Sequence, residues 1–110
     1  MTTDDHAETL SSEALRASSQ DVIVSASGEI DLATAPTMFD AVASALAAFG
    51  DDGRLVFDLG AVTFMDSAGL KAIALACRNI PGRVAVRNAP AQVRRLLDIS
   101  GIGQLVDVDG

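Results

Sequence analysis

Ser67 is the residue of this sequence best placed to carry chemistry, because its small hydroxyl directly follows Asp66 in the run Phe-Met-Asp-Ser-Ala-Gly-Leu over residues 64–70. A serine that attacks a substrate needs a neighbouring base. The only histidine, His6, lies in the polar N-terminal segment, so a serine–histidine–acid triad or a histidine metal site would depend on an unanchored residue. The pattern therefore indicates a serine that is modified rather than one that attacks. We predict no catalytic residue and no metal site.

The segments on either side of Ser67 predict where its hydroxyl lies. Residues 55–59, Leu-Val-Phe-Asp-Leu, are typical of a strand covered on both faces. The apolar residues of a helix over 67–78 recur at helical spacing: Leu70, Ile73, Ala74 and Cys77. Asp66 then occupies the N-cap, where its carboxylate accepts hydrogen bonds from the first turn. Ser67 becomes the first helical residue, at the rim of the sheet and the positive end of the helix dipole, where a phosphate is tolerated.

The rest of the chain predicts a small mixed α/β fold. A weak strand over 10–16 and a stronger one over 22–26 form an antiparallel edge hairpin. Thr34 is the expected N-cap, and Gly50 the expected stop, of a helix that opens with Ala35-Pro36. Further strands are expected over 54–59, 83–87 and 104–108, with a helix over 90–99 that stops at the Gly101-Ile102-Gly103 stretch. Strands separated by helices imply parallel pairing, with the helices packed against the sheet. Five residues are expected in the core: Leu55, Val56, Phe57, Ile73 and Val84.

Three segments, in order and in register over residues 21–108, carry a resemblance to a known family. They are Ser-Gly-Glu-Ile-Asp over 27–31, Val-Thr-Phe-Met-Asp-Ser-Ala-Gly-Leu over 62–70, and Ala-Pro-Ala-Gln-Val-Arg-Arg-Leu-Leu-Asp-Ile-Ser-Gly-Ile over 89–102. Together they resemble the single-domain anti-sigma factor antagonists of bacteria, which are built on the STAS (sulfate transporter and anti-sigma factor antagonist) domain. Lys71 stands where many members have glycine or another small residue.

The resemblance implies a phosphorylation switch. The unphosphorylated chain would capture an anti-sigma factor and so release a sigma factor to polymerase. That anti-sigma factor, acting as a serine kinase of the histidine-kinase-like ATPase fold, would phosphorylate Ser67 and end the capture, and a metal-dependent serine phosphatase would restore it. ATP and Mg²⁺ belong to the kinase, so no cofactor is expected here. The resemblance also implies partner-binding roles for Asp31, Asp66, Ser67 and Gly69.

Two of these residues have a structural interpretation that remains open at this stage. Asp31 ends a strand just before a helix, where an aspartate often serves only the turn. Asp66 acts as an N-cap whether or not a kinase reads its charge.

Composition restricts the class of protein. A chain of 110 residues predicts one domain, which we expect over 9–110, after a flexible acidic tail over 1–8. The net charge of −7 argues against nucleic acid or an anionic membrane surface as a partner. No apolar run is long enough to span a membrane, and the acidic N-terminus does not match a secretory signal. The single cysteine, Cys77, fits a core residue in a reducing compartment. We expect a cytoplasmic monomer or weak dimer.

Two other functions remain open. A STAS-like subunit of a lipid or anion transporter would use the same fold as a structural or regulatory part. A scaffold subunit of a large stress-sensing assembly would use it as a building block.

Overall fold

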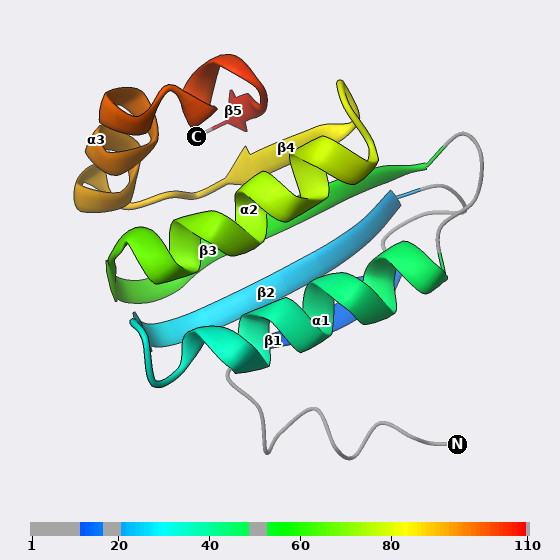
Figure 1. Ribbon diagram of the computed structural model, residues 1–110, viewed down its shortest axis with the longest axis horizontal. Coiled ribbons are helices and arrows are strands. Elements are labelled where there is room, and N and C mark those ends of the chain that lie inside the picture. The colour runs from blue at the N-terminus through cyan, green and yellow to red at the C-terminus, as the bar shows by residue number, and fades with distance from the viewer. Residues whose placement is uncertain (1–11, 17–20, 49–52, 110) are drawn as a thin grey trace.

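A computed structural model of the chain describes residues 12–16, 21–48 and 53–109. Its elements follow one another along the chain as shown in Figure 1: β1 (Ser12–Arg16), β2 (Asp21–Ile30), α1 (Ala35–Ala47), β3 (Arg54–Met65), α2 (Ser67–Asn79), β4 (Val84–Arg87), α3 (Ala91–Ser100), the 3-10 helix η2 (Ile102–Gln104) and β5 (Asp107–Asp109).

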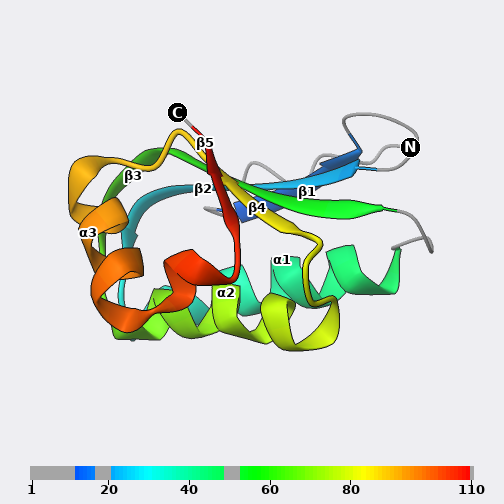
Figure 2. The same ribbon diagram turned by 90° about the horizontal axis from the view of Figure 1, so that it is seen from above.

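Within the described residues, the sheet has five strands in the order β1-β2-β3-β4-β5. β1 pairs antiparallel with β2, and the three remaining pairs of neighbouring strands are parallel. This arrangement confirms the predicted mixed sheet, because a short turn can only reverse the chain whereas a helical crossover returns it to the same direction. Figure 2 shows α1 and α2 against the same face of the sheet and α3 at one end of it.

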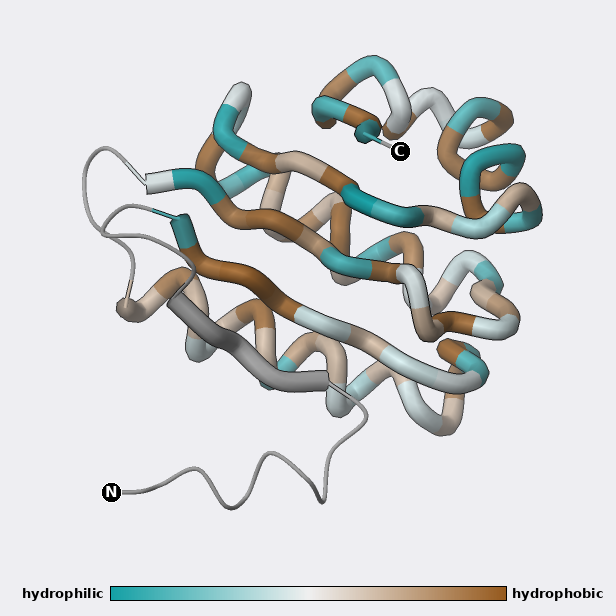
Figure 3. Tube along the Cα trace, turned by 180° about the vertical axis from the view of Figure 1, so that it is seen from behind, coloured by the Kyte–Doolittle hydropathy of each residue, from teal (hydrophilic) through white to brown (hydrophobic). Residues whose placement is uncertain are grey.

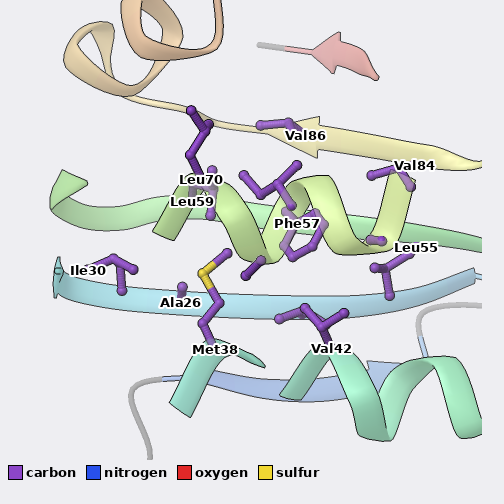
Figure 4. Close-up of a cluster of buried hydrophobic side chains, with 14 of the residues drawn as sticks. Ala26, Ile30, Met38, Val42, Leu55, Phe57, Leu59, Leu70, Val84 and Val86 are labelled. Carbon is purple, nitrogen blue, oxygen red and sulfur yellow. The ribbon is translucent and has the colours of Figure 1, made fainter. Parts of the chain in front are cut away.

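The core lies between the sheet and this helical layer. Hydrophobic stretches of β2 and β3 run side by side (Figure 3), because Val22, Ile23 and Val24 pair with residues 55–57. Met38 and Val42 are buried on the face of α1 that packs against the sheet (Figure 4). The five residues predicted to be in the core are all buried: Leu55, Val56, Phe57, Ile73 and Val84.

Several boundaries differ from the predicted ones. β2 and β3 continue to Ile30 and Met65, past the polar and glycine-containing segments at which strands were expected to stop. Shifts in the pairing register near Ser27 and Gly28 absorb this irregularity, and Gly28 adopts a positive φ of 75° there. The extension matters for function because it places the ends of both strands next to the start of α2.

The predicted strand over 104–108 is wrong in its first half. Gly101 adopts a left-handed conformation at the end of α3, as a helix stop should, but the chain then forms η2 instead of an extended strand. The amides of Gln104 and Leu105 donate to the carbonyls of Gly101 and Ile102. Only Asp107–Asp109 pair with β4.

Two further predictions concern α1. Its N-cap position is Thr34, as expected, but the threonine side chain makes no capping hydrogen bond to the helix. The helix ends at Ala47, with Ala48 at the C-cap. Three predicted features fall outside the described residues: the helix stop at Gly50, the first residues of the strand over 10–16, and the tail over 1–8.

Candidate functional site

The C-terminal ends of β2 and β3 meet at one edge of the sheet. Ile30 pairs with Met65, and the amide of Asp66 donates to the carbonyl of Ile30 at 3.1 Å. The loop after β2 and the start of α2 consequently lie together, at the left of Figure 1. This pairing brings three of the four predicted partner-binding residues to one edge of the sheet: Asp31, Asp66 and Ser67.

Asp66 caps α2 as predicted. It has extended backbone angles, and its carboxylate accepts a hydrogen bond from the amide of Ala68 at 2.8 Å. Because this bond satisfies an amide of the first turn, the helix begins at Ser67, which is an exposed residue. The serine therefore lies on the surface at the positive end of the helix dipole.

Asp31 organises the turn between β2 and α1. Its Oδ1 atom accepts hydrogen bonds from the amide of Ala33 at 3.0 Å and from the amide of Thr34 at 3.1 Å. The hydrogen bond from the Thr34 amide is the main cause that lowers the pKa of the Asp31 carboxyl from its usual value. Asp31 is therefore ionised at neutral pH, and the turn interpretation of this residue is correct whatever else it does.

The Thr34 hydroxyl takes part in the same turn. It accepts a hydrogen bond from the amide of Asp31 at 2.9 Å, and it lies 2.7 Å from the carbonyl oxygen of Glu29 and 3.2 Å from Asp31 Oδ1. Its single proton can be donated to only one of these two oxygens at a time. This explains why Thr34 does not cap α1 through its side chain: the hydroxyl is turned back toward the end of β2.

Gly69 is the fourth predicted partner-binding residue, and it is buried. A Cβ atom at this position would lie 2.6 Å from Ile30 Cγ2 and 2.8 Å from Met65 Cγ, both closer than real contacts allow. The first turn of α2 thus rests directly on the ends of β2 and β3, and any larger residue at this position would force the side chains of Ile30 and Met65 to shift. Gly69 has a packing role that fixes where Ser67 stands, and direct contact with a partner stays a prediction.

Sequence reasoning missed Gln92, in the first turn of α3. Its Nε2 donates to the carbonyl of Met65 at 2.8 Å, and its Oε1 accepts from the amide of Met65 at 3.1 Å. A glutamine at the start of a helix is an ordinary surface residue in a sequence pattern. Only the three-dimensional position of α3 beside the end of β3 gives it a role.

Comparison with known proteins agrees with this geometry. A family model described as the Mlab, STAS domain matches residues 13–107. This chain belongs to that STAS-domain family. Within the described part of this STAS domain, no helix is both long and apolar enough to cross a membrane.

Solved structures with the same fold include three informative neighbours of this STAS domain. An anti-sigma factor antagonist from Mycobacterium paratuberculosis is 28% identical, with a TM-score of 0.77 over 89% of this chain and 83% of that chain. The anti-sigma factor antagonist SpoIIAA in its unphosphorylated form is 20% identical, with a TM-score of 0.71 over 88% and 86% of the two chains. The Bacillus cell fate determinant SpoIIAA in its phosphorylated form is 18% identical, with a TM-score of 0.66 over 88% and 89%.

Proposed function

We propose that this STAS domain is an anti-sigma factor antagonist whose unphosphorylated form binds an anti-sigma factor and whose binding ends when Ser67 is phosphorylated. The observation that carries the proposal is the exposed Ser67 at the start of α2, next to the capping Asp66 and at the same sheet edge as Asp31. The likeness to an anti-sigma factor antagonist at 28% identity supports it. In this role the chain is a regulator and not an enzyme.

A phosphate on Ser67 is expected to change binding without unfolding the domain. Its charge of about −1.5 to −2 gains about 0.3 to 1 kcal/mol from an exposed helix N-terminus, while Asp66 and the acidic protein repel it. These opposing contributions are small. At an interface shaped for a neutral hydroxyl, however, the dianion must lose its water without gaining a partner. A loss of about 2.7 kcal/mol there weakens binding roughly 100-fold.

The remaining components follow from this switch. The anti-sigma factor itself acts as the serine kinase and brings ATP and Mg²⁺, a serine phosphatase reverses the modification, and capture frees a sigma factor for polymerase. The proposal assigns the chain to the cytoplasm, where sigma factors act, as a monomer or weak dimer. Asp31, Asp66, Ser67 and Gly69 form or support the binding surface.

A transporter-associated role is a second candidate, because STAS domains are named after sulfate transporters as well as anti-sigma factor antagonists. Membership of the family does not separate the two functions. Phosphorylation of Ser67 would separate them, because only the antagonist requires a partner that binds ATP and transfers phosphate to this hydroxyl.

Affinity purification of the full chain from its native cell, followed by identification of the bound protein, tests the proposal. We expect an ATP-binding anti-sigma factor, which should transfer radioactive phosphate from ATP to the wild-type chain and to Ser44→Ala, a control at an exposed serine of α1. Ser67→Ala should bind the anti-sigma factor but accept no phosphate. Recovery of transporter subunits alone would favour the second candidate.

Titration calorimetry with the same purified anti-sigma factor tests the switch itself. Ser67→Glu should melt at the wild-type temperature yet bind about 100-fold more weakly than Ser67→Ala. Equal affinities for the two variants would rule out an electrostatic switch, and a shared fall in melting temperature would mean that Ser67 is a structural residue.

A further inference from the structure

Leu32 is the most exposed large hydrophobic residue of the described chain, at 81% of its maximal area. Four other large hydrophobic residues are also exposed: Phe64, Ile99, Leu105 and Val108. Single apolar side chains on a surface are common and do not by themselves indicate a binding site. Leu32 differs from them in the turn that holds it and in its neighbours.

The turn holds Leu32 from both sides. The amide of Asp31 donates to the Thr34 hydroxyl at 2.9 Å, and the Asp31 carboxylate accepts from the amides of Ala33 and Thr34. The carbonyl of Asp31 also accepts from the amide of Ala35 at 2.7 Å. Because the backbone of this turn is already fixed, a partner that binds Leu32 need not order the loop, and the entropy cost is limited to the rotamers of the leucine side chain.

Leu32 also lies at the proposed switch. It stands two residues beyond Ile30, and Ser67 stands two residues beyond Met65, while Ile30 and Met65 are paired neighbours in the sheet. The exposed leucine, the ionised Asp31 and the exposed Ser67 therefore occupy one edge of the molecule.

We propose that Leu32 is the apolar anchor of the anti-sigma factor interface. Its side chain enters an apolar pocket of the anti-sigma factor, and the rim of that pocket carries a basic side chain that faces Asp31. The inference rests on the proposed function and adds to it the residue and the partner chemistry that supply the binding energy. Charge complementarity supports this occupant, since Asp31 is ionised and the chain has a net charge of −7.

The arrangement also gives the phosphate a specific place to act. An apolar contact stabilises a complex only when water is excluded around it. Because the basic side chain of the partner already pairs with Asp31, a dianion on Ser67 at the same edge gains no partner of its own, and the cost of removing its water keeps the Leu32 contact from closing.

The test compares Leu32→Ser with Leu105→Ser, the same substitution at an exposed leucine that follows η2, at 56% exposure. The probe is the purified ATP-binding anti-sigma factor from the affinity purification. Leu32→Ser should lower its affinity at least about tenfold, equivalent to about 1.4 kcal/mol, with an unchanged melting temperature, because an anchor residue supplies a large share of the binding energy. Leu105→Ser should bind as the wild type does. Leu32→Met, which keeps an apolar side chain, should restore most of the affinity.

Salt dependence separates the apolar contact from the charged one. The loss caused by Leu32→Ser should be the same at low and high salt, whereas the loss caused by Asp31→Asn should shrink at high salt, because ions screen exposed charges.

The outcomes distinguish the two levels of the proposal. If the wild type binds, Ser67→Glu does not, and Leu32→Ser binds like the wild type, the inference about Leu32 is wrong while the proposed function stands. Equal losses for Leu32→Ser and Leu105→Ser would likewise overturn it. If the wild type and Ser67→Glu bind alike, or the wild type does not bind at all, the proposed function and the inference fail together.

Discussion

The side-chain amide of Gln92 makes two hydrogen bonds to the backbone of Met65, in the place where a neighbouring strand would pair. It donates to the Met65 carbonyl and accepts from the Met65 amide, so one side chain satisfies both backbone groups that a neighbouring strand would otherwise satisfy. In a parallel strand the N–H and C=O of one residue point to the same side. Pairing between β3 and β4 ends at Asp58 and Arg87, so α3 supplies the partner that β4 no longer provides. Because Met65 directly precedes Asp66, this contact ties α3 to the start of α2.

We predict that Gln92→Ala lowers the free energy of unfolding by about 1 to 3 kcal/mol, since it leaves the partly buried amide and carbonyl of Met65 without their partner. Gln92→Glu should be at least as harmful, because its carboxylate has no donor for the Met65 carbonyl. Denaturant unfolding measures both, with Gln104→Ala as the control at an exposed glutamine of η2. If Gln92→Ala and Gln104→Ala have the same midpoint, water replaces these two bonds at no cost.

The substitution Gly69→Ala should have two opposing effects on stability, a gain from helix propensity and a loss from overpacking. Alanine is favoured over glycine inside a helix by about 1 kcal/mol. Here its Cβ would lie 2.6 Å from Ile30 Cγ2, and overpacking of this kind costs about 1 to 3 kcal/mol. We therefore expect a net loss of stability in denaturant unfolding.

The Ile30→Leu background tests the cause of that loss. Leucine has no methyl group on Cβ, so Gly69→Ala should be less harmful there than in the wild type, and the double-mutant cycle should show a favourable coupling. A Gly69→Ala protein more stable than the wild type would contradict the close approach of α2 to β2.

How far the sequence predicts this site depends on how local each interaction is. The cap at Asp66 and the exposure of Ser67 involve only consecutive residues, and both were predictable from N-cap chemistry. Gln92 acts on a residue 27 positions away, and Gly69 of α2 acts through its contact with Ile30 of β2, so neither role is visible before the helices and strands are packed together. The same holds for Thr34, whose hydroxyl bonds to the end of β2 rather than to its own helix.

The C-terminal segment was mispredicted for a different reason. The apolar and β-branched residues of this segment favour a strand: Leu105, Val106 and Val108. However, the left-handed Gly101 allows backbone hydrogen bonds that form the 3-10 helix η2. Periodicity does not separate these outcomes over so few residues.

Asp66→Asn separates capping from recognition. Asparagine is a comparable N-cap, so the free energy of unfolding should change by less than about 0.5 kcal/mol. The substitution removes a charge next to Ser67, and we expect phosphorylation by the anti-sigma factor, or binding to it, to weaken. Asp40→Asn, at an exposed position of α1, controls for the change in net charge. Unchanged phosphorylation and binding would reduce Asp66 to a structural cap.

Asp31 should make stability depend on pH in the acid range. The hydrogen bond from the Thr34 amide holds its folded-state pKa below the unfolded value, which is about 3.9 for an aspartate. A group with a lowered folded pKa contributes stability that is fully present above the unfolded pKa and is lost as pH falls through the folded pKa. The wild type should therefore lose more stability than Asp31→Asn as the pH falls below about 4. Denaturant unfolding of both proteins across that range measures the difference, in which the other carboxyl groups cancel. Parallel curves would mean that the turn does not favour the ionised form of Asp31.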